Sequence, residues 1–445
     1  MDSRRCFREF LRYTSLNVMG MIGLSCYILA DTFFVSKGLG AKGLAALNLA
    51  IPVYNFINGS GLMIGMGSGI RYSILKSQKQ EKRADQVFTH GLIFTACLAA
   101  VFFLLGLFAS EQIAAMLGAD ETVFQMSRIY LQVILLFSPM FMMNNLLLCF
   151  VRNDGAPQRS MTAMIVGSLS NVVLDYIFIF PLEMGIFGAV LATGFAPLIS
   201  ILILSPYFIR KKNQFHPVRC SLRLKILGQI VSGGLPSLIT EVSSGIVIIV
   251  FNLLILRLAG NTGVAAYGVI ANLSLVVIAI YTGIAQGIQP LLSRNYGAGR
   301  KREVESVFYY AAAAAVLISA VVYAVVFWGA DPIALVFNSE KNETLQSIAA
   351  GGLRIYFTGC VFAGLNIILS VYFTSTEFAL PAHIISVLRG FVVIIPAACI
   401  LAQIAGMTGV WCAFPATEFL VCVLGGVLYG FAKKKDRTEK YVRKG

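Results

Sequence analysis

The sequence predicts an all-α integral membrane protein with about twelve transmembrane helices arranged as two similar halves. Of its 445 residues, 58% are apolar and only 13% are charged, and the mean hydropathy is +0.80. A soluble domain of ordinary composition carries about 25% charged residues. Apolar stretches recur along the whole chain, each long enough to cross a hydrocarbon core of about 30 Å at 1.5 Å per residue. Since backbone groups in lipid must be satisfied within the segment, these stretches are expected to be helices.

The expected spans follow one another with short connections. They lie near residues 12–35, 44–70, 86–109, 127–150, 160–181, 185–209, 227–256, 264–291, 307–329, 346–373, 384–404 and 408–431. The basic N-terminal segment runs into a long apolar stretch without a small-residue cleavage site, so it is expected to be the first span and not a removed signal.

The positive charge is distributed unevenly between the two sides of these spans. The net charge is +14, and 28 of the 35 Lys and Arg residues fall on one side of the membrane. They lie in the segments 4–12, 71–83, 152–159, 210–225, 294–302 and 433–444. By the positive-inside rule this side is the cytoplasm, which places both termini there and requires an even number of crossings. A nucleic-acid partner is not needed to explain the charge.

An internal repeat appears when the chain is aligned with itself at an offset of about 220 residues. Gly-Leu-Ala-Ala at 43–46 falls on Gly-Val-Ala-Ala at 263–266, and Arg-Ile-Tyr at 128–130 falls on the same three residues at 354–356. Matches in a common order at a near-constant offset indicate duplication. Six crossings per half make the repeat parallel, with a pseudo-two-fold axis along the membrane normal. Two such bundles can rock for alternating access, although duplication could equally build a larger receptor or channel.

This repeat also predicts the domain organisation. Residues 1–209 are expected to form an amino-terminal six-helix lobe and residues 226–445 a carboxy-terminal six-helix lobe. The basic segment 210–225 is expected to be a cytoplasmic linker between them.

Few ionisable residues lie inside the expected spans, and each costs roughly 2.5–3.5 kcal/mol on insertion scales. Asp31 in the first span and Asp175 in the fifth both reach the outer half of the bilayer, and Asn171 lies one turn before Asp175 on the same helix face. These three residues form a candidate coupling site for H⁺ or Na⁺, because close carboxylates repel and one of them readily keeps a proton. The alternative is an interfacial Asp31 and a structural hydrogen bond at Asp175.

Glu241, in the seventh span, has a depth that mirrors that of Asp31 in the other half. It is either a second cation site, a counter-charge for a cationic substrate, or a buried polar bond to a neighbouring helix.

Arg389 and Glu418 lie in the last two spans. A long Arg side chain near the inner end of its helix could reach Glu418 and form a structural ion pair, since charges in spans commonly pair.

No enzyme, cofactor or structural metal is expected. The nine Cys residues are scattered without a C-x-x-C pair or a Cys/His cluster, and the three His residues stand alone. No arrangement of nucleophile and base appears either. A Na⁺ ion at Asp31, Asn171 and Asp175 is the one metal ion considered.

Several motifs resemble those of the multidrug and toxic compound extrusion (MATE) transporters, in particular the bacterial branch. They are Ala30-Asp31-Thr32, Arg-Asn-Asp-Gly-Ala-Pro at 152–157, Asn171 to Asp175 with Tyr-Ile-Phe-Ile after it, Gly-Leu-Pro at 234–236, the segment 283–299 with Gln286, Gln289 and Pro290, Arg389, and Gly-Val-Trp at 409–411 with Pro415 and Glu418. The likeness covers essentially the whole chain.

This resemblance implies a two-lobed, V-shaped twelve-helix exporter in the bacterial inner membrane that exchanges inward H⁺ or Na⁺ for outward organic cations. Its coupling site carries over to Asp31, Asn171 and Asp175. Gln286 and Gln289 join Glu241 as a candidate second cation or substrate site. The expected partners are small amphipathic organic cations and membrane lipids, and the protein is expected to be a monomer.

Other functions remain open on the sequence alone. A flippase for lipid-linked precursors, from the same superfamily, would be expected to line its cavity with several Arg or Lys residues, which are nearly absent from these spans. A channel or receptor would need neither the acidic pair nor the duplicated halves.

Overall fold

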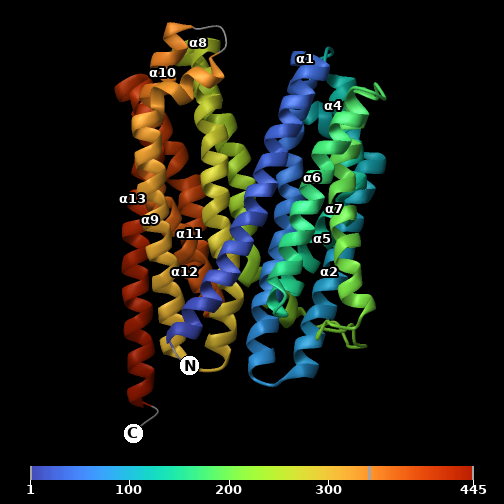
Figure 1. Cartoon of the computed structure of the whole chain (residues 1–445), viewed down its shortest axis with the longest axis vertical. Helices are drawn as coiled ribbons and strands as arrows, with labels where there is room; N and C mark the ends of the chain where they lie inside the picture. Colours follow the sequence, from blue (N-terminus) through green and yellow to red (C-terminus); the bar gives the residue numbers. More distant parts are fainter. Residues whose placement is uncertain (1–2, 339–341, 443–445) are drawn as a thin grey trace. The chain divides into compact units, whose positions relative to one another are not determined.

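The computed structural model describes residues 3–338 and 342–442, and it describes side chains as far as Lys434 except those of residues 3 and 337 (Figure 1). Much of the basic stretch 433–444 therefore lies outside the described side chains. The described residues form helices and short connections. The helices are α1 (Ser3–Ser77), α2 (Glu81–Phe108), α3 (Ser110–Met116), α4 (Phe124–Leu136), α5 (Ser138–Asn153), α6 (Pro157–Ile179), α7 (Gly185–Ile209), α8 (Leu224–Gly297), α9 (Lys301–Phe337), α10 (Glu343–Tyr356), η1 (Phe357–Gly359), α11 (Cys360–Ser375), α12 (Ala379–Val387), η2 (Leu388–Val392) and α13 (Ile394–Val442).

The number of spans agrees with the prediction. Eight helices in the described chain are long and apolar enough to cross a membrane, and α4 with α5, bent by 45° at their junction, makes a ninth. Three of these helices contain a sharp break at a glycine, Gly40, Gly260 or Gly406. Counting each side of these breaks separately brings the nine spans to the twelve that the sequence predicts.

Single glycines replace the outer loops that hydropathy suggests near residues 36–43 and 257–263. The backbone of Gly40 has φ 66° and ψ −159°, a conformation that residues with a Cβ rarely adopt. Helical conformation resumes directly on both sides, so α1 consists of two arms joined at one residue. The two arms lie side by side, since the Tyr27 and Tyr54 hydroxyls are 2.9 Å apart.

Left-handed backbone positions confirm the internal repeat. Positive φ occurs at Gly40 and Gly260, at Lys79 and Gly299, at Gly155 and Glu377, and at Gly185 and Gly406. Each pair is separated by 220 to 222 positions, the offset that the sequence alignment predicts. The two halves therefore turn at equivalent residues.

The chain divides into two compact units. The larger unit contains Leu11–Gly245 and Ser293–Lys301, and the smaller unit contains Met1–Phe10, Ile246–Leu292 and Arg302–Gly445. These units do not follow the repeat strictly, because the first part of α8 belongs to the larger unit. The lobes predicted from the sequence, with a linker at 210–225, remain a prediction.

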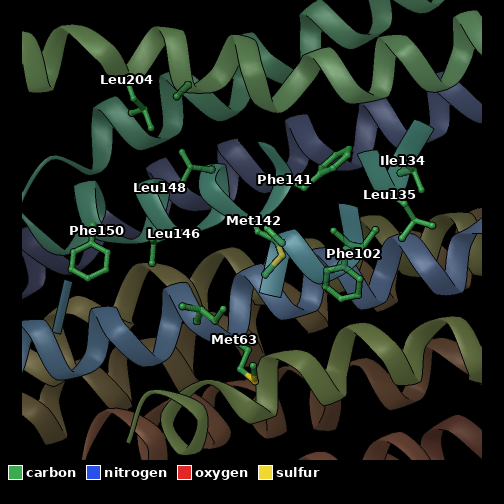
Figure 2. Packing of buried hydrophobic residues seen from close by; sticks show 14 of the residues in the cluster. Met63, Phe102, Ile134, Leu135, Phe141, Met142, Leu146, Leu148, Phe150 and Leu204 are labelled. Carbon is green, nitrogen blue, oxygen red and sulfur yellow. The ribbon is translucent and has the colours of Figure 1, made fainter. Parts of the chain in front are cut away.

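Apolar side chains from several helices form the core of the larger unit (Figure 2). Met63 of α1, Phe102 of α2, Leu135 of α4 and Met142 of α5 converge there, and Leu204 of α7 belongs to the same cluster. Burial of a Leu, Met or Phe side chain contributes about 1.5–3 kcal/mol relative to exposure in water, although in lipid close packing replaces much of this term.

Glycines on the second arm of α1 allow two other helices to approach closely. A Cβ added at Gly59 or Gly67 would collide with the first part of α8, and one added at Gly61 or Gly65 would collide with α5. Small residues four positions apart share a helix face, so each face of this arm accommodates one neighbour. This packing fixes the distance from α1 to both helices.

The linker is bound to the first part of α2 and to the end of α5, where Asp154 directly follows the helix. Four of its backbone N–H groups donate to side chains of these helices: Gln214 to Asp154 (2.9 Å), His216 to Asp85 (3.1 Å), Val218 to Thr89 (2.9 Å) and Arg223 to His90 Nε2 (2.9 Å). His90 is buried and not solvated as an isolated residue near a span end would be. The predicted linker is thus an ordered part of the larger unit.

Candidate functional site

The carboxyl groups of Asp31 and Asp175 meet inside the larger unit. Asp31 lies on the first arm of α1 and is 7% exposed, whereas Asp175 lies on α6 and is fully buried. Their side chains lie within hydrogen-bonding range of each other. Because a carboxylate has no donor, a hydrogen bond between the two groups forms only when one of them holds a proton. The two residues selected from the sequence therefore form one site.

Polar side chains from three helices surround this pair. Asn171 lies one turn before Asp175 on α6, and its amide nitrogen donates to Asp175 Oδ2 (3.0 Å) when its oxygen faces the Thr193 N–H (3.2 Å). Tyr130 of α4 hydrogen-bonds to the Thr193 side chain and lies within electrostatic range of both carboxyls. Tyr130 and Thr193 could not be selected from the sequence, because hydroxyl residues are common inside spans.

The site has the chemistry of a small-cation site. Asp31 Oδ1 and Asp175 Oδ1 are buried and make no hydrogen bond within the described residues. A buried oxygen without a partner costs about 1–3 kcal/mol, more when it is charged, and a bound cation would remove this cost. A proton needs one of these oxygens. A hard cation such as Na⁺ needs several oxygen ligands, which the hydroxyls of Tyr130 and Thr193 and the Asn171 amide could supplement.

Glu241 belongs to a second polar group in the same unit. It lies in the first part of α8, and its Oε2 accepts from Asn58 Nδ2 at 3.4 Å. Asn145 of α5 donates to Asn58 Oδ1 at 2.8 Å. The Glu241 side chain is only partly buried and has no positively charged side chain among its described contacts. The sequence identified the acid but not the two asparagines that hold it.

A pair of tyrosines lies between these two groups. The Tyr27 hydroxyl on the first arm of α1 is 2.9 Å from the Tyr54 hydroxyl on the second arm. Tyr54 is within electrostatic range of both Asp31 and Glu241. The sequence contains a signal for both residues, since Tyr27 precedes Asp31 by one helical turn and Tyr54 precedes Asn58 by one turn.

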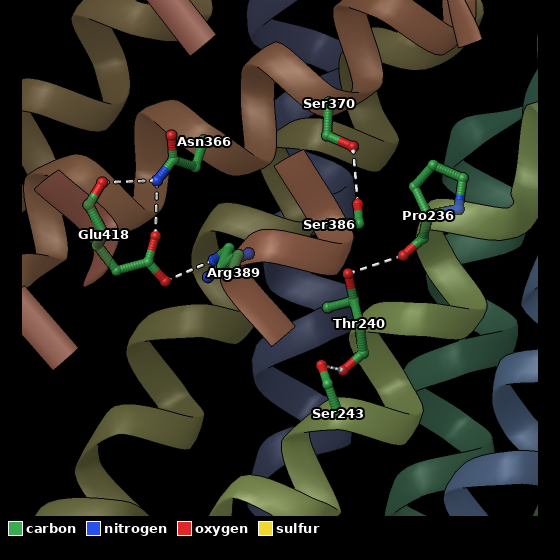
Figure 3. A network of polar contacts seen from close by, with 8 residues as sticks. All are labelled: Pro236, Thr240, Ser243, Asn366, Ser370, Ser386, Arg389 and Glu418. Carbon is green, nitrogen blue, oxygen red and sulfur yellow. Dashed lines mark hydrogen bonds and ion pairs between the residues drawn. The ribbon is translucent and has the colours of Figure 1, made fainter. Parts of the chain in front are cut away.

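Arg389 and Glu418 are in contact in the smaller unit (Figure 3). Arg389 Nε lies 2.5 Å from Glu418 Oε1, and Asn366 Nδ2 donates to Glu418 Oε2 at 2.7 Å. Asn366 also donates to the Glu418 backbone carbonyl at 2.9 Å. Both carboxylate oxygens therefore have a partner, whereas Asp31 and Asp175 each have one oxygen, Oδ1, without a described partner. A carboxylate with both oxygens hydrogen-bonded is typical of a structural ion pair.

The position of Arg389 depends on a local change of helix type. Arg389 lies in η2, a π-helical turn in which the Val393 N–H donates to the Leu388 carbonyl at 2.9 Å. Pro396 lies one helical turn after Val392 and has no N–H to donate to the Val392 carbonyl. The series of backbone hydrogen bonds along the helix is therefore already interrupted there. An inserted π-turn of this kind rotates the side chains before it and often occurs at functional positions.

Gln286 and Gln289 lie on the second part of α8. Gln286 is 7% exposed and Gln289 is fully buried. They belong to the smaller unit, whereas Glu241 belongs to the larger unit. Their joint role with Glu241 remains a prediction.

The loop after α5 makes a polar junction with the end of α1, the end of α7 and the linker. Asp154 accepts from the Tyr72 hydroxyl (2.9 Å), the Tyr207 hydroxyl (2.6 Å) and the Gln214 N–H. Burial raises the pKa of Asp154, and these three hydrogen bonds act in the opposite direction. The neighbouring Arg152 is fully buried, so this basic segment is not the exposed loop that charge counting suggests.

Comparison with known proteins gives independent evidence on the family to which this chain belongs. Multidrug export protein MepA of Staphylococcus saprophyticus is 26% identical over 425 residues, which cover 95% of this chain and 93% of that protein. Multidrug export protein MepA of Staphylococcus aureus is 25% identical over 427 residues, with the same coverage of both chains. The naming of these relatives as export proteins agrees with the prediction that the chain is not an enzyme.

Solved structures have the same fold. A crystal structure of MATE in complex with MaL6 superposes with a TM-score of 0.91 at 25% identity, over 99% of this chain and 98% of that chain. An outward-facing multidrug resistance MATE family transporter of the MOP superfamily gives a TM-score of 0.90 at 25% identity, over 97% and 96%.

The sequence model of the MatE family matches residues 18–177 and 236–400, one segment in each half of the chain. These segments contain the carboxyl pair and Glu241, and each segment covers most of one half of the internal repeat. The match extends over most of the chain, and the structural matches extend over nearly all of it. The chain is therefore a multi-pass membrane protein that belongs to the MatE family.

Proposed function

We propose that this protein is a secondary active exporter of organic cations, driven by inward movement of H⁺ or Na⁺. The observation that carries the proposal is the buried pair of Asp31 and Asp175, whose side chains lie within hydrogen-bonding range of each other and whose Oδ1 atoms have no described partner. The names of the curated relatives support multidrug export as the transport task.

The coupling follows from the charge of the pair. With one shared proton the site carries about one negative charge, and entry of a second proton or of Na⁺ neutralises it. Neutralisation removes this buried negative charge and satisfies the free oxygens of the pair, so the surrounding helices repack. Since one-for-one exchange of monovalent cations moves no net charge, the gradient of the coupling ion drives export: each tenfold difference in H⁺ or Na⁺ concentration supplies about 1.4 kcal/mol per ion, which is enough for about a tenfold gradient of the substrate.

Glu241 is proposed as the group that attracts the substrate cation. Its carboxylate is held by an amide donor and not by a positively charged side chain, so its charge remains available. Small amphipathic cations are the substrates that this acid would favour. We place the protein in the bacterial cytoplasmic membrane with both termini inside, acting as a monomer by alternating access.

Dye accumulation in cells tests this proposal. Cells that express the protein should accumulate less ethidium than cells with an empty vector, and dissipation of the ion gradients should abolish the difference. Dye levels that do not change with expression, for several cationic dyes, would contradict an exporter of organic cations.

A further inference from the structure

Two asparagine side chains in series connect α5 to Glu241. Asn145 Nδ2 of α5 donates to Asn58 Oδ1 on the second arm of α1 at 2.8 Å, and it also donates to the Asn58 backbone carbonyl at 3.3 Å. Asn58 Nδ2 donates to Glu241 Oε2 in the first part of α8 at 3.4 Å. All three residues belong to the larger unit, and each link between them is a direct hydrogen bond.

The backbone carbonyl of Asn58 fixes the direction of this series. Rotation of a side-chain amide by 180° exchanges its acceptor oxygen and its donor nitrogen, but a backbone carbonyl is always an acceptor. The Asn145 nitrogen must therefore face Asn58, since the Asn145 oxygen would meet that carbonyl as a second acceptor. The same nitrogen lies against Asn58 Oδ1, so the Asn58 amide cannot turn over without bringing two donors together. Asn145 thus keeps the Asn58 N–H directed at Glu241.

Two glycines next to Asn58 hold the three helices at contact distance. A Cβ added at Gly59 would lie 2.9 Å from Glu241 Cβ, and one added at Gly61 would lie 3.1 Å from Asn145 Nδ2. Gly59 therefore allows α8 to approach α1, and Gly61 allows α5 to approach the same arm. The positions of the two amides follow from this close backbone packing.

The Asn58 N–H leaves one oxygen of Glu241 open. It is the one hydrogen-bond donor to this carboxylate among the described residues, and it reaches only Oε2. The Glu241 side chain is partly exposed, and its Oε1 makes no hydrogen bond within the described part of the chain. A carboxylate buried without any donor is costly and is readily neutralised by a proton, whereas a hydrogen bond to the charged form favours that form. One oxygen is thus held, and the other can receive a cation.

We propose that Asn145 is a positioning residue for the substrate cation and that it acts on Glu241 through the Asn58 amide. Asn145 makes no described contact with Glu241 itself. By fixing the Asn58 amide, it keeps an N–H group on Glu241 Oε2. The carboxylate therefore remains charged and presents Oε1 to the positive group of the substrate.

This inference rests on the proposed function, and a double-mutant cycle tests it. Ethidium binding to the purified full-length protein is measured for the parent, Asn145→Leu, Glu241→Gln and the double variant. Asn145→Leu removes the donor with little change in volume and should weaken binding about three- to ten-fold, as the net loss of one hydrogen bond does. In the Glu241→Gln background, where no carboxylate remains to be positioned, the same change should alter affinity less than about two-fold.

A second cycle replaces the intermediate residue. Because Asn145 acts through Asn58, Asn145→Leu should also change affinity less than about two-fold in the Asn58→Leu background. A loss of packing between α5 and α1 would instead weaken binding in every background. Asn145→Ala, which cannot clash with its neighbours, should reproduce the effect of Asn145→Leu, and thermal unfolding in detergent shows that each variant is folded.

Asn55→Leu is the matched control. Asn55 lies on the same arm of α1 as Asn58 and joins the same two helices, but its side chain donates to the Ser244 hydroxyl at 3.4 Å and not to the Glu241 carboxylate. Any effect of Asn55→Leu on ethidium binding should therefore be the same in the parent and in the Glu241→Gln background.

The outcomes separate this inference from the proposed function. If the parent binds and exports ethidium but Asn145→Leu weakens binding equally in the parent, Asn58→Leu and Glu241→Gln backgrounds, Asn145 is a packing residue and the exporter stands. Unchanged ethidium affinity in Asn145→Leu or in Glu241→Gln would overturn the inference in the same way. If the parent protein neither binds nor exports ethidium, both proposals are contradicted.

Discussion

Gly40 and Gly260 lie 220 positions apart and share one backbone conformation, with φ 66° and ψ −159° at the first and φ 59° and ψ −157° at the second. Neither residue would bring an added Cβ within 4 Å of another group. Their common requirement is therefore the backbone conformation itself, which is essentially restricted to glycine.

Gly40→Ala and Gly260→Ala should each lower the free energy of unfolding by about 1–3 kcal/mol, because the strain has no packing gain to offset it. Thermal unfolding of the purified variants in detergent measures this. Gly268→Ala is the control: it lies in the helical part of α8, and its added Cβ also meets open space. That variant should be as stable as the parent or slightly more stable. Equal stability of all three variants would contradict the strain at the two turns.

Asp31→Asn and Asp175→Asn should each abolish gradient-driven export while the protein remains folded and inserted. The amide keeps the volume of the carboxyl but cannot change its charge when a cation arrives. Export by membrane vesicles and thermal stability are measured on the same preparations. Full export by both variants would show that the pair is structural.

Arg389→Met and Glu418→Gln should each reduce thermal stability, because removal of one partner leaves the other charge buried alone at a typical cost of 3–5 kcal/mol. The double variant should recover much of the loss, because the glutamine amide oxygen and the backbone carbonyl of residue 418 can still accept from Asn366. If Glu418→Gln is as stable as the parent and no longer exports, Glu418 is a functional acid and the smaller unit contains a further site.

Asp154→Asn should destabilise the larger unit by about 1–3 kcal/mol, because the amide nitrogen cannot accept from Tyr72 or Tyr207. The effect should depend on pH. Burial raises the pKa of Asp154 above 3.8, so its contribution is largest below that value and declines as the pH rises through the folded pKa. The difference in melting temperature between parent and variant should therefore narrow as the pH rises from 4 to 8. A constant or widening difference would argue against the raised pKa.

The spans were predictable because hydropathy and length act locally. Residues 185–209 were predicted as one span and form α7 with the same bounds. A charge in lipid is costly wherever its partner lies, so the ionisable residues inside the spans could be selected from the sequence. They include Asp31, Asp175, Arg389 and Glu418. The contact between Arg389 and Glu418 followed from the reach of an Arg side chain.

Other parts of the site could not be predicted from the sequence. Hydropathy cannot distinguish a loop from the single-residue turn at Gly40. The contact between Tyr27 and Tyr54 depends on the rotation of each arm about its axis, which a pattern of apolar residues leaves undefined. The π-turn at Arg389 depends on where the chain accommodates Pro396. The binding of the linker to His90 uses a backbone N–H, and because every residue except proline has one, no sequence pattern reveals this contact.

Transport of ethidium by the purified protein in liposomes, with H⁺ and Na⁺ gradients imposed separately, tests cation-coupled export most directly. Ethidium should move against its concentration gradient when one of the two cations flows in the opposite direction, and Asp31→Asn should remove this dependence. Movement of ethidium only down its own gradient, at the same rate with either cation gradient and in the Asp31→Asn variant, would contradict the account.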